Sequence, residues 1–231
     1  MTRGAASRTA AVVALVAFVL LTAAVAAHGG APVYGDEALL RWSVGHRPST
    51  ALAAARALTA TGTGLVPYLL AVLAGLLAAR SWRGRAGAIA TCVACLALGQ
   101  LVRYGLMSLM ARPRPATADR AVETWGSSFP SGHATTAAMA AGLVVLAVLA
   151  RAPRGGPFIV AAVVGWGALI GLTRVYLGVH WLSDVIGGWL LAVSWLGLWA
   201  YAARRLPRPR EPGGGKPGPA HRAQHHDTPT D

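Results

Sequence analysis

Charged residues are scarce in this sequence. Asp, Glu, Lys and Arg make up 13% of its 231 residues, whereas hydrophobic residues make up 55%; soluble domains usually carry about 25% charged residues. The composition therefore argues against a soluble globular protein and favours a chain embedded in a membrane. Acidic residues are the rarer of the two charged classes, with eight Asp and Glu against 21 Lys and Arg. Nucleic acid, anionic lipid or cytoplasmic loops could each explain a basic excess of this size, and the positions of the charges decide between them.

Cysteine is also nearly absent, with two residues in the whole chain. Cys92 and Cys95 form a C-x-x-C pattern, which in a soluble α/β protein would indicate redox or metal chemistry. Here the pair lies within a run of Ala, Val and Leu, where thiols behave as small hydrophobic side chains. We therefore expect no redox or metal-binding role for them.

Six apolar runs approach the length of a membrane-spanning helix. A hydrocarbon core of about 30 Å requires roughly 20 residues at 1.5 Å each. A cleaved signal peptide is the alternative for the first run, because the small residues at 23–27 resemble a peptidase site; we favour an uncleaved span. The predicted fold is all-α, a polytopic membrane protein with about six transmembrane helices. The runs are Thr9 to Ala27, Leu65 to Ala79, Ala86 to Met110, Ala134 to Ala150, Phe158 to Thr173 and Asp184 to Ala203.

Basic residues concentrate in every second connection between these runs. Short cytoplasmic connections collect Lys and Arg, and the basic segments are residues 3–8, 80–85, 151–154 and 204–222. This pattern predicts a plasma-membrane protein with both termini in the cytoplasm. It disfavours nucleic-acid binding, because the basic residues form no stripe with interleaved aromatic side chains.

The same pattern divides the chain into four parts. Residues 1–31 form an N-terminal transmembrane helix, and residues 32–64 form an outer loop with one or two helices on the membrane surface. Residues 65–203 form a core of five transmembrane helices. Residues 204–231 are rich in Pro, Gly and charge and predict a disordered, basic cytoplasmic tail.

Three polar clusters interrupt the apolar pattern and share the outer side in this topology. Arg114 and Arg174 can bracket a tetrahedral oxyanion with directional N–H donors, and Ser131 adds a hydroxyl. Gly132 lets the backbone approach closely at the start of a helical run, whose first N–H groups and dipole favour an anion. The pattern predicts a phosphate site. The clusters are "ARPRP" (111–115), "FPSGH" (129–133) and "TRVYLGVHWLSD" (173–184).

Two histidines accompany the predicted phosphate site. A neutral imidazole can attack phosphorus, and a protonated one can donate to a leaving oxygen. His180 and Asp184 are four residues apart and share a face if the last helix starts near Gly178, so Asp184 can fix the tautomer of His180. This assigns His180 as the nucleophile and His133 as the acid. Two histidines and one carboxylate are a thin ligand set for a two-metal phosphatase, and we predict chemistry that needs neither metal nor cofactor.

These clusters resemble the motifs of the type 2 phosphatidic acid phosphatase family, K-x6-R-P, P-S-G-H and S-R-x5-H-x3-D. Residues 130–133 match the second motif without change. Arg174, His180 and Asp184 match the third at the family's spacing, with Thr173 in place of Ser. The resemblance extends over roughly residues 36–203 and implies a six-helix membrane fold with its site on the outer face.

The resemblance also implies roles for individual residues. His180 would carry a phosphohistidine intermediate, His133 would protonate the leaving group, and Asp184 would support His180. The phosphate contacts would come from Arg114, Ser131, Gly132 and Arg174. Family members of this architecture dephosphorylate lipid phosphates or pyrophosphates, such as phosphatidate, phosphatidylglycerophosphate and polyprenyl pyrophosphates including undecaprenyl pyrophosphate.

The first motif is met only at Arg114 and Pro115, because Met107 stands where the family has lysine. Arg103 lies one helical turn before Met107 on the same face. Two interpretations stay open for it: a substitute phosphate contact, or an interfacial arginine that extends towards headgroups. Arg112 is likewise open between a structural and a functional role.

We therefore expect an integral-membrane phosphatase that hydrolyses a lipid phosphate or pyrophosphate at the outer membrane face. Its predicted partners are that lipid and the bilayer. A phosphotransferase could use the same site, and the missing lysine leaves open a weakly active protein that binds or moves an anionic lipid. Vanadium haloperoxidases share the family's anion pocket but are mostly soluble, which disfavours that activity here.

Overall fold

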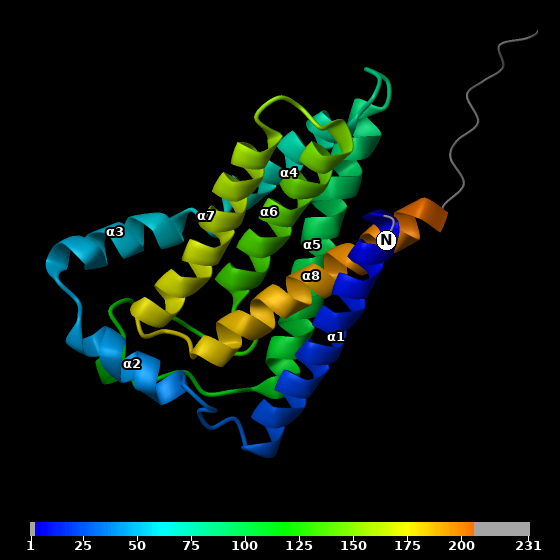
Figure 1. Cartoon of the computed structure of the whole chain (residues 1–231). Coiled ribbons are helices and arrows are strands. Elements are labelled where there is room, and N and C mark those ends of the chain that lie inside the picture. The colour runs from blue at the N-terminus through cyan, green and yellow to red at the C-terminus, as the bar shows by residue number, and fades with distance from the viewer. Residues whose placement is uncertain (1–2, 206–231) are drawn as a thin grey trace, which may run out of the picture.

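The computed structural model describes residues 3–205, which form eight α-helices and one 3₁₀ turn without any strand (Figure 1). The all-α fold expected from the sequence is confirmed. Most of the predicted tail, from residue 206 onward, lies outside the described residues. The helices are α1 (Arg3–Ala27), α2 (Asp36–Gly45), α3 (Ser49–Ala60), α4 (Leu65–Ala78), α5 (Arg85–Met110), α6 (Gly132–Arg151), α7 (Gly156–Tyr176) and α8 (Leu182–Arg205), and the 3₁₀ turn is η1 (Thr117–Asp119).

Five of the described helices are individually long and apolar enough to cross a membrane: α1, α5, α6, α7 and α8. The 14 residues of α4 would span only about 21 Å at 1.5 Å per residue. Together α3 and α4 form a sixth candidate span that is bent by 50° at its break. Gly64 in this break has a φ of +68°, which favours glycine. The number of candidate spans is therefore five, or six if α3 and α4 count as one bent span. The expected position of α3 on the membrane surface stays a prediction.

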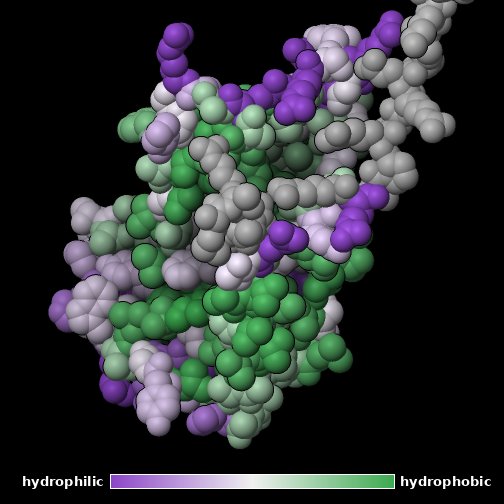
Figure 2. All heavy atoms as spheres, turned by 45° about the vertical axis from the view of Figure 1, so that its right-hand side comes forward, coloured by the Kyte–Doolittle hydropathy of each residue, from purple (hydrophilic) through white to green (hydrophobic). Residues whose placement is uncertain are grey.

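The central helix of the bundle is α6, which contacts α4, α5, α7 and α8. Its buried face consists largely of Ala, Thr and Val, and small side chains let neighbouring helices approach closely. The outer helices carry the large exposed hydrophobic side chains, among them Val12, Val16 and Leu20 on α1. Figure 2 shows hydrophobic side chains over much of the visible face and hydrophilic ones gathered at its upper rim. This distribution suits a bilayer, because lipid tails solvate apolar side chains.

The two ends of the bundle differ in what they carry. Helices α1 and α8 pack against each other and run antiparallel, so that the N-terminal end of α1 lies beside the C-terminal end of α8 (Figure 1). The opposite end holds α2 and the loops 111–131 and 177–181 (Figure 1). The three polar clusters of the sequence therefore gather at one end of the bundle, as the alternating topology predicts.

Candidate active site

Four separate elements supply the polar side chains at this end of the bundle. Arg103 comes from α5, Ser131 and Gly132 from the start of α6, Arg174 from the last turn of α7, and Asp184 from the first turn of α8. Arg114 lies on the loop before α6, and His180 lies on the loop before α8. The predicted site residues thus converge, although up to 81 residues separate them in the sequence.

The turn after α7 places His180. Val179 N–H donates to Arg174 C=O and Gly178 N–H donates to Val175 C=O, which is the Schellman pattern that closes a helix. Gly178 has a φ of +68°, and a Cβ there would collide with the backbone carbonyl of Asp119. Only glycine fits this turn without strain, so the glycine in "TRVYLGVHWLSD" reverses the chain and presents His180 beside α8.

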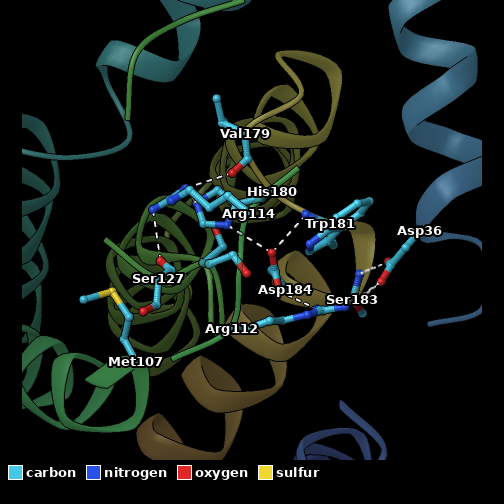
Figure 3. Close-up of polar contacts among 12 residues, drawn as sticks. Asp36, Met107, Arg112, Arg114, Ser127, Val179, His180, Trp181, Ser183 and Asp184 are labelled. Carbon is cyan, nitrogen blue, oxygen red and sulfur yellow. Dashed lines mark hydrogen bonds and ion pairs between the residues drawn. The ribbon is translucent and has the colours of Figure 1, made fainter. Parts of the chain in front are cut away.

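The contact between His180 and Asp184 forms differently from the predicted one. Helix α8 begins at Leu182, so the expectation of a start near Gly178 is wrong and His180 precedes the helix. Asp184 reaches back instead: its Oδ2 accepts the N–H of Trp181 at 2.9 Å and lies 3.3 Å from His180 Nδ1 (Figure 3). A first-turn carboxylate that accepts a backbone N–H just before the helix is half of a capping box. One side chain therefore caps α8 and orients the imidazole.

Arg114 lies against the other nitrogen of His180. Its Nη1 is 2.9 Å from His180 Nε2 and 2.8 Å from the carbonyl oxygen of Val179. Because Arg114 can only donate, Nε2 accepts, and His180 is neutral with its proton on Nδ1 facing Asp184. The remaining Arg114 N–H groups donate to backbone carbonyls of the loop 125–127. Arg114 thus holds the loop in place and donates to the lone pair of His180 Nε2. To bind a phosphate oxygen, Arg114 must release the N–H that it donates to Nε2.

Burial governs the protonation of these two loop residues. It lowers the pKa of His180 to about 4, although the hydrogen bond and charge of Asp184 act in the opposite direction. Burial also lowers the pKa of Arg114 to about 10, with Asp184 again opposing the shift. At neutral pH His180 is therefore an unprotonated base beside a charged guanidinium, which is the state a nucleophile requires.

The start of α6 presents unpaired donors to the same space. Ser131 precedes the helix, and the first helical bond runs from Thr135 N–H to Ser131 C=O. The N–H groups of residues 132–134 therefore have no partner within the helix. Ser131 is buried, and its hydroxyl has no hydrogen-bond partner among residues 3–205. A buried hydroxyl without a partner is costly, so this arrangement fits an anion at the helix start.

Arg174 and His133 complete this group. Arg174 is 5% exposed; its Nη1 donates to Thr59 Oγ1 at 3.1 Å, whereas its buried Nε has no partner in the described part of the chain. His133 Nε2 lies 3.5 Å from Thr63 Oγ1. Arg174, His180, Arg114 and Arg103 all interact electrostatically with His133. The bend between α3 and α4 therefore supplies Thr59 and Thr63, two contacts that the sequence analysis did not identify.

Arg103 occupies the space that the missing lysine leaves beside Met107. Its side chain is buried, and Nη1 lies 3.1 Å from Met107 Sδ. A Cβ added to Gly132 would lie 3.2 Å from Arg103 Cζ, so the guanidinium packs directly on the first residue of α6. This placement favours the phosphate-contact interpretation over the interfacial one, because the charge points into the bundle.

Arg112 and Asp36 are two further polar residues that the sequence analysis did not assign to the site. Both are completely buried, and Arg112 forms ion pairs with Asp184 at 2.6 Å and with Asp36 at 2.9 Å (Figure 3). The available signal was weak: Arg112 belongs to "ARPRP", and Asp36 is one of only eight acidic residues in a largely apolar chain.

Comparisons with known proteins agree on one relationship. A family model described as "PAP2 superfamily" matches residues 88–208. Phosphatidylglycerophosphatase B of Bacillus subtilis (strain 168) is 30% identical over 186 residues, which cover 76% of this chain and 86% of that protein. The crystal structure of a transmembrane PAP2 type phosphatidylglycerolphosphate phosphatase from Bacillus subtilis superposes with a TM-score of 0.70 at 24% identity, covering 87% of this chain and 98% of that one.

Proposed function

The chain belongs to the PAP2 superfamily and is a membrane lipid phosphatase of that family, and from this premise we propose that it hydrolyses a lipid phosphate monoester through a phosphohistidine on His180. Phosphatidylglycerophosphate is the first substrate to test, because the curated relative is a phosphatidylglycerophosphatase. The observation that carries the mechanism is the neutral His180: Asp184 holds Nδ1, and Arg114 lies on the lone pair of Nε2.

The first step transfers the phosphoryl group to the enzyme. Nε2 of His180 attacks phosphorus, the bond from phosphorus to the lipid oxygen breaks, and His133 donates a proton to that oxygen. The imidazole becomes cationic as the bond forms, and the carboxylate of Asp184 stabilises the charge. In the second step a water molecule gives its proton to His133 and attacks phosphorus, which breaks the N–P bond and releases inorganic phosphate.

The phosphate oxygens require donors on several sides, and this end of the bundle supplies them. We assign Arg114, Arg174, the Ser131 hydroxyl and the backbone N–H of Gly132 to the phosphate. The partnerless donors of Ser131 and Arg174 support this assignment, because an anion would satisfy both. We add Arg103 as the cation in place of the missing lysine, since its guanidinium lies against Gly132.

In the proposed reaction the chemistry proceeds without a metal ion. The charge that a metal would neutralise is met by guanidinium groups, which bind phosphate through directed N–H donors.

The site faces the outer side of the plasma membrane, with both termini in the cytoplasm. The basic segments at 80–85 and 151–154 support this orientation, because they lie at the end of the bundle opposite the site and such segments stay in the cytoplasm. Apolar surfaces of the neighbouring helices would hold the acyl chains while the arginines hold the headgroup.

A phosphate-release assay on the purified protein tests the proposal. Wild-type protein should release inorganic phosphate from phosphatidylglycerophosphate in the presence of EDTA, and His180→Ala should abolish the release. A panel with phosphatidate and a polyprenyl pyrophosphate identifies the preferred lipid. Activity that survives His180→Ala, or that requires Mg²⁺, contradicts the mechanism. Transfer of phosphate to an added alcohol instead of water would indicate a phosphotransferase, and vanadate binding without any turnover would indicate a lipid-binding protein.

A further inference from the structure

Arg112 lies beside the catalytic group, and its side-chain hydrogen bonds reach none of the residues assigned to the phosphate. Its Nε donates to Gly30 C=O, and one N–H of Nη2 donates to Ala31 C=O. The other donors reach Ser183 Oγ, Asp184 Oδ1 and Asp36 Oδ2. All five N–H groups are therefore used within the protein, and unlike Arg114, which lies on His180 Nε2, Arg112 donates to no atom at which the phosphate would bind.

Asp36 anchors this arrangement from the far side. Its Oδ1 accepts Ser183 N–H at 2.8 Å, and its Oδ2 accepts Val33 N–H and the Ser183 hydroxyl as well as Arg112. Figure 3 shows Arg112 extended beneath Asp184 towards Ser183 and Asp36. Asp36, the first residue of α2, thereby connects α2 to the start of α8 through buried charges. It lies outside residues 88–208, the range that the family model matches.

Asp184 is consequently held on both carboxylate oxygens. Arg112 binds Oδ1, while Oδ2 contacts His180 Nδ1 and the N–H of Trp181. A carboxylate fixed by a guanidinium on one oxygen keeps its other oxygen in a single direction. Asp36 balances the charge of Arg112, so that Asp184 retains its full negative charge towards the imidazole.

We propose that Asp36 and Arg112 are positioning residues of the phosphatase reaction, which hold Asp184 in the orientation and charge state that His180 requires. The inference rests on the proposed function of His180. Asp36 acts through Arg112, and Arg112 acts through Asp184. Neither residue touches the substrate, so both should affect turnover more than substrate binding.

The sign of each effect follows from the charges that face His180. Asp184 faces its Nδ1, Arg114 faces its Nε2, and Arg174 and His133 lie within electrostatic range. Asp36→Asn leaves the positive charge of Arg112 unbalanced and lowers the pKa of His180 further. Arg112→Met leaves two carboxylates without their cation and raises the pKa of His180. The double variant has the same cluster charge as the wild type, because it loses one charge of each sign.

Steady-state kinetics against pH test the proposal, since the acid limb of kcat/KM reports the free enzyme. For the wild type this limb should lie near pH 4, where His180 gains its proton. Asp36→Asn should move the limb to lower pH and Arg112→Met to higher pH, and the double variant should restore its position. In all three, kcat should fall by about 10- to 100-fold with KM nearly unchanged, the range known for residues that orient metal-bound histidines and carboxylates. The loss of kcat in the double variant should be no larger than in Arg112→Met alone, because Asp36 acts on Asp184 only through Arg112.

Two further variants separate positioning from general stability. Glu37→Gln removes the neighbouring carboxylate, which is exposed and paired only with Arg41 in the described residues, and should keep wild-type kinetics. Ser183→Ala removes the hydroxyl between Arg112 and Asp36 but neither charge, and should lower kcat about threefold even if the charge variants do not fold.

Each outcome decides the question. Three results would overturn the inference: a wild-type kcat in folded Asp36→Asn, acid limbs of the two single variants that move in the same direction, or losses in kcat that multiply in the double variant. If the charge variants do not fold, a wild-type kcat in Ser183→Ala would overturn it. A wild type that releases no phosphate, or an active His180→Ala, overturns the proposed function instead, and these two controls are read first.

Discussion

At the scale of single residues, the substitution at Met107 is the chain's main departure from its family motif. An aliphatic side chain there removes one cation from the phosphate site, but Arg103 places a guanidinium beside it from one turn earlier. The two positions are neighbours on α5 because residues four apart share a helix face. The charge is thus retained in space although the motif is broken in sequence.

Arg103→Gln should therefore weaken catalysis. A hydrogen bond to a charged group contributes about 1.5–3 kcal/mol, so we expect kcat/KM to fall by about 10- to 100-fold, and Met107→Lys in the same chain should recover most of the loss. Phosphate release from a lipid phosphate measures both effects. Arg41→Gln is the matched control, because it removes an exposed arginine whose ion-pair partner is Glu37. Unchanged kinetics in Arg103→Gln would show that Arg103 does not bind phosphate.

At the scale of elements, helix ends carry most residues of the proposed site. The end of α7 provides Arg174, and the starts of α6 and α8 provide Ser131 and Asp184. The last turn of α3 provides Thr59, and the break that follows provides Thr63. Backbone donors are unpaired at the N-terminus of a helix, and such a terminus favours an anion. The backbone N–H of Ser131 also donates to Asp184 C=O at 3.0 Å, which joins the starts of α6 and α8.

The turn at Gly178 tests how closely activity depends on this arrangement. Gly178→Ala places a Cβ against Asp119 C=O and 2.8 Å from Arg47 Nη2 at a φ of +68°. The left-handed backbone alone costs about 1–2 kcal/mol, and the collision moves the segment that carries His180. Because a misplacement of about 1 Å can cost about 100-fold in rate, we expect kcat to fall by at least tenfold.

Gly155→Ala is the control for this variant. Gly155 has a φ of +77° at the opposite end of the bundle, and a Cβ there meets no described atom within 4 Å. It should lower the melting temperature to a similar degree through strain and leave kcat at the wild-type value. If both variants lose activity in proportion to stability, the turn does not position His180.

At the scale of the whole molecule, the basic segments 80–85 and 151–154 lie at one end of the bundle and the candidate site lies at the other. The bent pair of α3 and α4 reaches the site, where Thr59 contacts Arg174 and Thr63 contacts His133. Arg47 contributes here by donating to the carbonyls of Tyr176 and Asp119, which ties the outer segment to the loops of the site.

Cysteine labelling tests the orientation of the bundle. In a Cys92→Ala, Cys95→Ala background, a membrane-impermeant maleimide applied to intact cells should label Trp125→Cys, and should label Trp82→Cys only after permeabilisation. The two tryptophans form a matched pair, since both are highly exposed and lie on loops at opposite ends. The reverse pattern would place the site on the cytoplasmic side.

The sequence by itself determined the helical membrane class, the approximate span positions, and the residues that gather at one end. These properties are local. The length of each apolar run sets the predicted spans. The even number of predicted spans between the motifs puts His133, Arg174 and His180 on one side. The predicted contact of His180 with Asp184 also occurs, although its helical geometry does not.

Only the tertiary structure decided which side chains complete the site. Asp36 meets Ser183 across 147 residues and Arg112 across 76, and no periodicity in the sequence encodes such pairings. The four-residue spacing of Arg103 and Met107 shows from the sequence that they are neighbours on one helix. The position of the Arg103 guanidinium against Gly132 depends instead on how α5 packs on α6. The physical reason is that hydropathy and helix period are set within a few residues of the chain, whereas the partners of a buried charge are set by helices that meet only after folding.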